Sequence, residues 1–187
     1  HKSGGLIAAH FDKDTKSNFL KKIRKNFEKK MNSNSIYQNV EIVDLSSKLS
    51  EPNSVDAVLT FRNLHNWLGP MMANIFANSY EALKPGGIFG VVEHRAKPGT
   101  SLQEMKRTGY VTEQHAVEEA EKHGFILFAK SEINANSKDT KDYSKGVWTL
   151  PPTLRLKEEN KEDYLAIGES DRTVSYTHLT LPTKRIV

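Results

Sequence analysis

Short apolar runs with little polar alternation constrain the fold of this sequence most. They occupy residues 6–11, 40–44, 55–61 and 88–93. A strand with one solvent-exposed face alternates apolar and polar residues, whereas a strand buried on both faces is apolar along its length. The runs therefore predict strands of a parallel sheet with both faces covered.

Amphipathic helices are predicted between these strands. In residues 14–33, Leu20, Ile23, Phe27 and Met31 recur at steps of three and four, which is the spacing of one helix face. A second helix is predicted over residues 71–83. The predicted class is α/β, in which helices alternate with the strands of one sheet.

Further boundaries come from caps and breakers. Pro85 and the two glycines after it end the second helix, because proline and glycine do not continue a helix. Ser101 and Glu104 form a capping box that predicts a short helix. The remaining predictions, in order, are a helix over 112–123, a strand over 125–133, a polar loop over 134–145 and a strand over 146–150.

Two segments carry a resemblance to a known family. Residues 56–61 read Asp-Ala-Val-Leu-Thr-Phe, and residues 82–87 read Ala-Leu-Lys-Pro-Gly-Gly before a buried strand. The pair resembles the second half of class I S-adenosylmethionine-dependent methyltransferases, in which the helix before the fifth strand ends in Leu-Lys-Pro-Gly-Gly. A closer resemblance, to an uncharacterised bacterial methyltransferase group, is carried by residues 61–67, 91–95, 109–113, 131–136 and 146–152.

The resemblance implies a doubly wound, mostly parallel Rossmann-like sheet, bound S-adenosylmethionine and methyl transfer to an acceptor that it does not identify. Members of the family begin with a strand and a glycine-rich loop around the methionine part of the cofactor. Here the resemblance begins at the second strand. We therefore expect residues 1–173 to be a partial methyltransferase domain that lacks its first strand and is impaired in folding and cofactor binding.

The last residues, 174–187, resemble a translated sequencing adapter, the transposase mosaic end, and we expect them to be non-native. Without Lys184 and Arg185, the formal net charge falls from +4 to +2. So slight a basic excess does not predict a nucleic-acid partner.

Composition excludes several other classes. The absence of cysteine excludes a disulfide framework, a thiolate metal site and a cysteine nucleophile. No run reaches the roughly 18 apolar residues of a membrane span. We expect a small-molecule substrate and a cytoplasmic location, with export left open because of the expected loss of the N-terminus. The oligomeric state is left open.

Candidate cofactor-binding residues follow the predicted strands, because ligands of open parallel sheets lie beyond the carboxyl ends of the strands. The candidates are His10, Phe11, Asp12, Asp44, Leu45, Phe61, Arg62 and Asn63. The resemblance places a ribose-binding acid after the first strand present, where this chain has His10 and, two residues on, Asp12. It places the adenine contact at Asp44 and Leu45, with Phe11 available to pack on the base.

Candidate catalytic residues lie at the next strand ends. His65 and His94 are the two candidate bases, since histidine exchanges protons near neutral pH. Glu93 is expected to orient His94 or the substrate, Arg95 to hold an anionic group, and Tyr110 to form an aromatic wall. A structural role for each histidine is the plain alternative.

No metal site is predicted. Possible ligands are present at His65, Glu93, His94 and His115, but no spacing in the sequence brings three of them together. A noncatalytic cofactor-binding protein and another Rossmann-type enzyme stay open as alternatives, because a fold does not determine a reaction.

Overall fold

The computed structural model describes residues 4–173 and the backbone of residues 178–180. The rest of the expected non-native segment lies outside the described residues. The strands are β1 (Leu6–His10), β2 (Val40–Asp44), β3 (Val55–Phe61), β4 (Leu83–His94), β5 (Ile126–Ala129), β6 (Arg172–Thr173) and β7 (His178–Thr180). The α-helices are α1 (Asn18–Asn32), α2 (Pro70–Ala82), α3 (Leu102–Thr108), α4 (Glu113–Lys122) and α5 (Lys161–Ile167). The 3₁₀ turns of the described residues are η1 (Ser35–Tyr37), η2 (Leu64–Asn66) and η3 (Gly146–Thr149).

The strands form two groups. β1 and β2 pair in parallel as one sheet, and a second sheet has the order β3-β4-β7-β5, with β6 on the end of β4. β3 and β4 are parallel, whereas β6 and β7 run antiparallel to β4. The parallel pairs with helical connections confirm the predicted Rossmann-like α/β architecture. They also place His10 opposite Asp44, and Phe61 opposite Val92.

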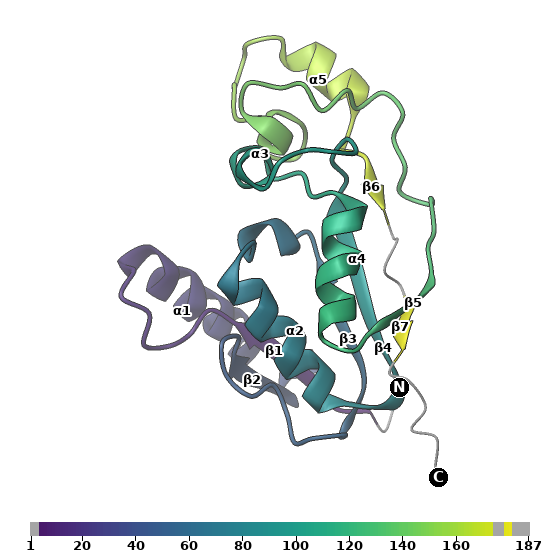
Figure 1. The fold of residues 1–187 in the computed structure, drawn as a ribbon. Helices are drawn as coiled ribbons and strands as arrows, with labels where there is room; N and C mark the ends of the chain where they lie inside the picture. Colours follow the sequence, from purple (N-terminus) through teal and green to yellow (C-terminus); the bar gives the residue numbers. More distant parts are fainter. Residues whose placement is uncertain (1–3, 174–177, 181–187) are drawn as a thin grey trace.

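The main core lies between the β3–β4 sheet and helices α2 and α4, which stand side by side in Figure 1. Phe76 of α2 meets Phe89 of β4 edge-on, with ring centroids 5.0 Å apart, and Phe125 lies 5.1 Å from Phe89. Aromatic rings bury large apolar areas, so this cluster fixes α2 against β4. It thereby fixes the strand ends that lie beside η2.

The opposite face of β3 differs from its prediction. Leu59 and Phe61 are 59% and 58% exposed, whereas Thr60 between them is buried. The described residues cover only one face of β3. The expectation that both faces are covered is therefore wrong for this strand within the described part of the chain.

Most helix boundaries agree with the sequence. Ser17, Ser101 and Thr112 cap α1, α3 and α4, and each side chain accepts a hydrogen bond from an amide three residues on. Such caps satisfy amides that have no partner inside the helix. The helices predicted at these three places are confirmed.

Two predicted strands are wrong in extent or kind. The strand predicted over 146–150 is wrong: residues 146–149 form the turn η3, because Gly146 has a φ of +57° and lies too close to the Thr108 backbone for any side chain. The strand predicted over 125–133 ends at Ala129. β4 is longer than predicted, since it begins at Leu83 and includes the Lys-Pro-Gly-Gly segment.

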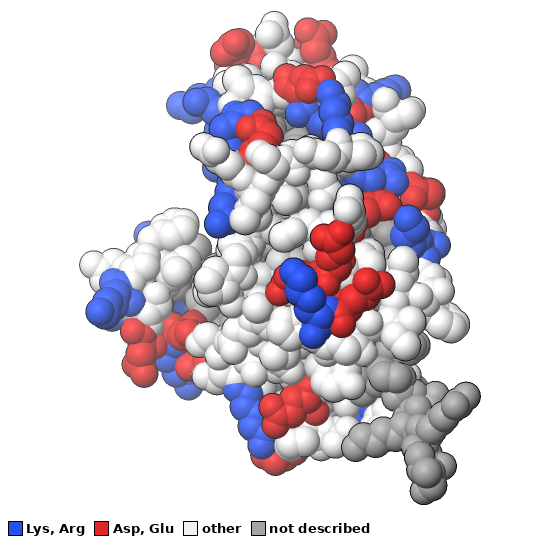
Figure 2. Space-filling view, in the orientation of Figure 1, with Lys and Arg blue, Asp and Glu red and all other residues white. Residues whose placement is uncertain are grey.

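Charges of both signs lie mixed on the face shown in Figure 2. Lys122 pairs with Glu119, and Lys130 pairs with Glu113, along and beside α4. Among the described residues, no helix has both the length and the apolar character needed to cross a bilayer.

Candidate functional site

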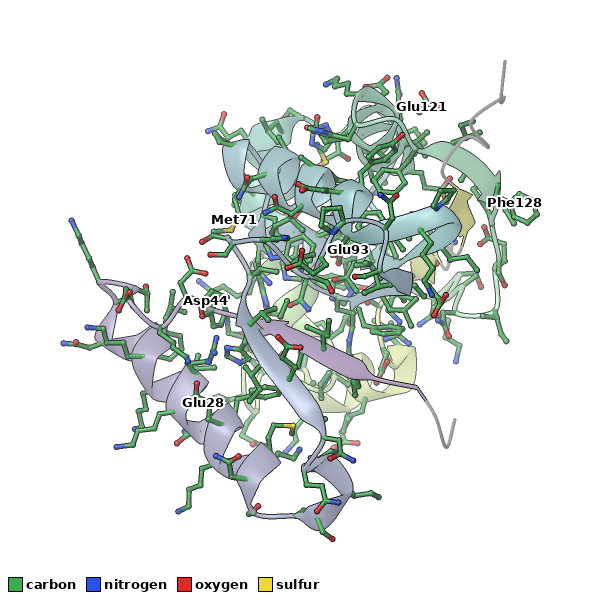
Figure 3. The ribbon with its side chains drawn as sticks, turned by 90° about the horizontal axis from the view of Figure 1, so that it is seen from below. Glu28, Asp44, Met71, Glu93, Glu121 and Phe128 are labelled. Atoms are coloured by element: carbon green, nitrogen blue, oxygen red, sulfur yellow. The ribbon has the colours of Figure 1, made fainter. Side chains whose placement is uncertain are left out.

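A buried carboxylate lies at the end of β4, where Figure 3 labels Glu93. Its Oε2 accepts a hydrogen bond from the backbone amide of His65 at 3.1 Å, and its Oε1 accepts one from the amide of His94 at 2.8 Å. The His65 ring approaches the same carboxylate, with Nδ1 3.0 Å from Oε1. In the tautomer in which Nδ1 donates to Glu93, the Nε2 atom of His65 is a proton acceptor.

His94 lies beside this pair. Its Nδ1 atom is 2.5 Å from the hydroxyl of Ser170, its Nε2 atom is 4.0 Å from Glu93 Oε1, and its ring centroid is 5.4 Å from that of His65. Burial lowers the pKa of His94 to about 4, although the Glu93 carboxylate acts in the opposite direction. The imidazole of His94 is therefore neutral near pH 7.

The grouping of His65, Glu93 and His94 arises from the fold. One nitrogen of each histidine and one oxygen of the glutamate all lie within 4.8 Å of one another. His65 is 28 residues from Glu93 in sequence and reaches it because η2 follows β3, whose partner is β4. The sequence placed these residues at the ends of parallel strands, but it did not predict that the three side chains meet, because η2 turns His65 back toward the end of β4.

Arg95, predicted to hold an anionic group, is engaged by acidic residues of the chain. Its Nη2 atom lies 2.8 Å from Asp171 Oδ1, and its Nη1 atom lies 2.8 Å from Glu132 and 3.4 Å from Glu113. The hydrogen bond to Asp171 is the main cause of a raised pKa for the Arg95 guanidinium. Arg95 joins distant segments through these ion pairs.

Tyr110, predicted as an aromatic wall, is 2% exposed. Its hydroxyl donates to the buried Asp139 carboxylate, with both oxygens at 3.0 Å, and its ring meets that of His94 edge-on at 6.3 Å. Burial, together with the Asp139 charge, raises the pKa of Tyr110. Tyr110 thus packs behind His94.

A cavity of about 330 Å³ lies at the carboxyl ends of β3 and β4. Its lining residues are Phe61, Arg62, Val92, Asn134, Glu169 and Arg172. The backbone amide of Arg62 donates to the Val92 carbonyl at 2.7 Å, which holds the end of β3 against β4. After burial, the charges of Arg172 and Arg62 also lower the pKa of His94, so two residues of the cavity act electrostatically on this histidine.

The other cofactor candidates gather at the ends of β1 and β2. The Leu45 amide donates to the His10 carbonyl at 2.8 Å, and Asp12 Oδ1 accepts from the Ser46 amide at 3.1 Å. Asp44 Oδ1 accepts from Arg24 Nη1 at 3.1 Å and from the Lys13 amide at 3.3 Å. The structure thus brings the predicted residues of these two strands together at one edge.

The remaining contacts of His10, Phe11 and Asn63 are local. The Phe11 amide donates to the Nδ1 atom of His10 at 2.8 Å, and the ring of His10 stacks on Phe27 at 4.5 Å. Burial, and then the charge of Arg24, lowers the pKa of His10. The exposed Asn63 precedes η2, and its carbonyl accepts from the Asn66 amide at 2.9 Å.

Sequence reasoning missed Arg24, which is 3% exposed. It lies four residues after Leu20 and three before Phe27, so it shares the apolar face of α1, where a charged residue was not expected to be buried. Its Nε atom donates to Glu28 at 2.7 Å, and its Nη1 atom donates to the Phe11 carbonyl at 2.8 Å. In Figure 3, Glu28 and Asp44 lie beside α1, away from Glu93, so the candidate residues form two separate groups.

Comparison with known proteins supports the architecture. The sequence matches no protein-family profile and no curated protein. The structure is similar to that of the [4+2]-cyclase SpnF, with a TM-score of 0.51, 18% identity, and coverage of 72% of this chain and 56% of the cyclase. It is also similar to a SAM-dependent methyltransferase from Methanosarcina mazei, with a TM-score of 0.50, 14% identity, and coverage of 73% of this chain and 76% of that one.

The chain spans about half the length of several of the solved structures that it resembles. At identities this low the likeness concerns the fold alone. The parallel strand pairs, the helical connections and these comparisons agree with one another. The chain therefore has the Rossmann-like fold of the class I S-adenosylmethionine-dependent methyltransferases.

Proposed function

We propose that this chain carries part of an S-adenosylmethionine-dependent methyltransferase that acts on a small-molecule acceptor. The observation that carries the proposal is the buried His65–Glu93 pair at the carboxyl ends of β3 and β4, in a chain with a methyltransferase fold. Ligands of such sheets lie at this edge. The fold alone does not decide the reaction, so the proposal depends on the residues of the site.

The candidate residues at the ends of β1 and β2 fit an adenosine. Asp44 keeps 29% of its side chain exposed, and among the described residues only its Oδ1 atom accepts hydrogen bonds. Its second oxygen is therefore available to the exocyclic amine of adenine. In the proposal Leu45 and Phe11 pack on the base, while His10 and Asp12 approach the ribose. When bound, S-adenosylmethionine supplies an electrophilic methyl group on its sulfonium sulfur.

The group formed by His65, Glu93 and His94 fits a methyl acceptor that loses a proton. Glu93 fixes the His65 tautomer in which Nε2 carries the lone pair, so this nitrogen can accept the proton of a hydroxyl or ammonium group. Neutral His94 packs beside it. In the proposal Phe61, Arg62 and Asn63 lie between the two groups of residues, and Arg62 attracts an anionic part of the ligand.

Arg95 and Tyr110 enter the proposal as positioning residues. Arg95 is held by Asp171 and Glu132, and the Tyr110 hydroxyl is held by Asp139, so both polar ends already have partners. We propose that they keep the end of β4 in place and do not contact the acceptor.

Binding is tested with the 187-residue chain and S-adenosylmethionine by ligand-observed NMR, which detects weak complexes. We expect saturation transfer to the adenine protons, and at least about tenfold weaker binding for Asp44→Asn, since a charged acceptor is lost. Asp56→Asn is the matched control, because Asp56 lies at the opposite end of a strand, where Lys84 pairs with it. The thermal unfolding temperature of each variant shows whether the protein stays folded when Arg24 loses its charged partner at residue 44.

Equal binding by wild type and Asp44→Asn would remove the adenine assignment. A folded chain that shows no transfer would contradict the cofactor proposal. The alternative is a different reaction on the same fold, which is favoured by one observation, the likeness to a protein named as a [4+2]-cyclase. Binding of the cofactor without release of S-adenosylhomocysteine in the presence of acceptors would favour that alternative.

A further inference from the structure

We propose that His65, Glu93 and His94 form a binding site for one divalent transition-metal ion of the Zn²⁺ type. Two imidazoles and one carboxylate are a ligand set that such ions accept. Three protein ligands leave a fourth position open for a water molecule or a substrate atom. The proposal concerns metal binding by the chain and does not depend on the proposed methyl transfer.

The distances fit a site that is almost assembled. Bonds of about 2.0–2.1 Å at tetrahedral angles place two ligand atoms roughly 3.3 Å apart. His65 Nδ1 lies 3.0 Å from Glu93 Oε1, and His94 Nε2 lies 4.0 Å from the same oxygen. All three ligand atoms lie within 4.8 Å of one another. Small rotations of the two histidine rings, which move their nitrogen atoms by about 1 Å, bring all three ligand atoms to coordination distance from one ion.

A second layer of contacts orients the ligands. Ser170 Oγ is 2.5 Å from Nδ1 of His94, which leaves Nε2 as the atom directed to the metal. Glu93 is held by the backbone amides of His65 and His94. Hydrogen bonds of this kind fix the tautomer and the ring angle of metal-ligating histidines. These contacts orient His94 and Glu93 before any ion arrives. The ion takes the place of the Nδ1 proton between His65 and Glu93, and that proton is released to solvent.

The surroundings limit access of water. The side chains of His65, Glu93 and His94 are only 7%, 4% and 11% exposed. Trp148 meets His65 edge-on at 5.9 Å, and Tyr110 closes the side of His94.

Two arginines near the cluster oppose the binding of a cation. Arg62 and Arg172 act on His94, but Arg172 is paired with Glu169. Glu93 contributes a full negative charge in contact with the ion. The half-buried His115 on α4 does not belong to this cluster.

The probe is the metal itself, added to untagged chain that has been stripped with a chelator. Zn²⁺ binding is measured by calorimetry, and Co²⁺ binding by visible absorption, which reports coordination number. We expect about one site per chain and a four- or five-coordinate Co²⁺ spectrum. Glu93→Gln and His94→Asn should each weaken binding at least about tenfold, whereas His115→Ala, the matched histidine control, should bind as the wild type does.

Ser170→Ala gives a test that leaves every ligand in place. It should weaken Zn²⁺ binding about tenfold, because it removes only the hydrogen bond that orients His94. In the wild type, Co²⁺ should shift the NMR signals of the His65 and His94 ring protons, a readout that needs no variant. Absence of those shifts, six-coordinate Co²⁺ on other histidines, or unchanged binding by folded His94→Asn would each overturn the proposal.

Discussion

Glu93 illustrates how one residue organises its surroundings. A buried carboxylate is unfavourable unless hydrogen bonds replace its hydration. Here two backbone amides and the His65 ring supply them. Because the amides belong to His65 and His94, the same bonds that stabilise the charge also bring the two histidines together.

Tyr110 is a second buried polar residue whose partner defines its role. We predict that Tyr110→Phe lowers the free energy of unfolding by about 1–3 kcal/mol, since Asp139 loses a donor in a buried place. Tyr37→Phe, in the turn η1, is the matched control and should change stability by less than about 0.5 kcal/mol. Urea unfolding followed by circular dichroism measures both.

A result in which Tyr110→Phe is as stable as wild type would show that the Asp139 amide contacts suffice. These contacts come from the amides of Lys141 and Asp171, at 2.9 and 2.8 Å. The same variant should retain the metal affinity of the wild type, because it loses only the hydroxyl and keeps the aromatic ring that packs against His94.

At the scale of elements, the junction of α3 with η3 shows why a predicted strand became a turn. Residues 146–149 meet the end of α3 so closely that a Cβ on Gly146 would lie 2.2 Å from the Thr108 carbonyl oxygen. Gly146 also has a φ of +57°, which is unfavourable for residues with a side chain. Close approach and left-handed backbone together require glycine here.

We therefore predict that Gly146→Ala destabilises the protein by about 3 kcal/mol or more, because strain and overlap with backbone add. Gly99→Ala is the matched control: Gly99 has a φ of +78°, but a Cβ there would meet nothing within 4 Å. It should cost only about 1 kcal/mol. Thermal unfolding of the two variants separates overlap from backbone strain, and equal losses would contradict the close contact.

At the scale of the whole molecule, the segment after β5 is tied back to the sheet by charge. Asp171 pairs with Arg95 at 2.8 Å and with Lys141 at 2.9 Å, and accepts from the Asn136 amide at 3.0 Å. Figure 1 shows this segment running along the molecule before β6 returns to β4. One carboxylate thus joins a strand end, a loop and the last described part of the domain.

Acid should break the ion pairs of Asp171 with Arg95 and Lys141. Burial raises the pKa of Asp171, but hydrogen bonds from Arg95 and Lys141 outweigh it and lower the pKa to about 2. A lowered pKa means that the stabilisation is complete above about pH 4 and is lost as the pH falls toward about 2. We predict a loss of about 1–2 kcal/mol over that range from this group, measured by urea unfolding at each pH.

Asp171→Asn provides the comparison. It should be less stable than wild type near neutral pH, and the difference should shrink in acid, where the wild-type carboxyl also becomes neutral. A difference that stays constant with pH would mean that shape, and not charge, makes residue 171 important.

The sequence by itself determined the α/β class, the α1, α2 and α4 helices, and the strand ends where candidate residues lie. These features are local: apolar spacing, caps such as Thr112, and breakers such as Pro85 act within a few residues. Tertiary structure alone decided that His65 meets Glu93, that Arg24 is buried beside Asp44, and that residues 146–149 turn. Each of these depends on contacts between residues far apart in sequence, which pairing of strands and close packing create and which no local pattern records.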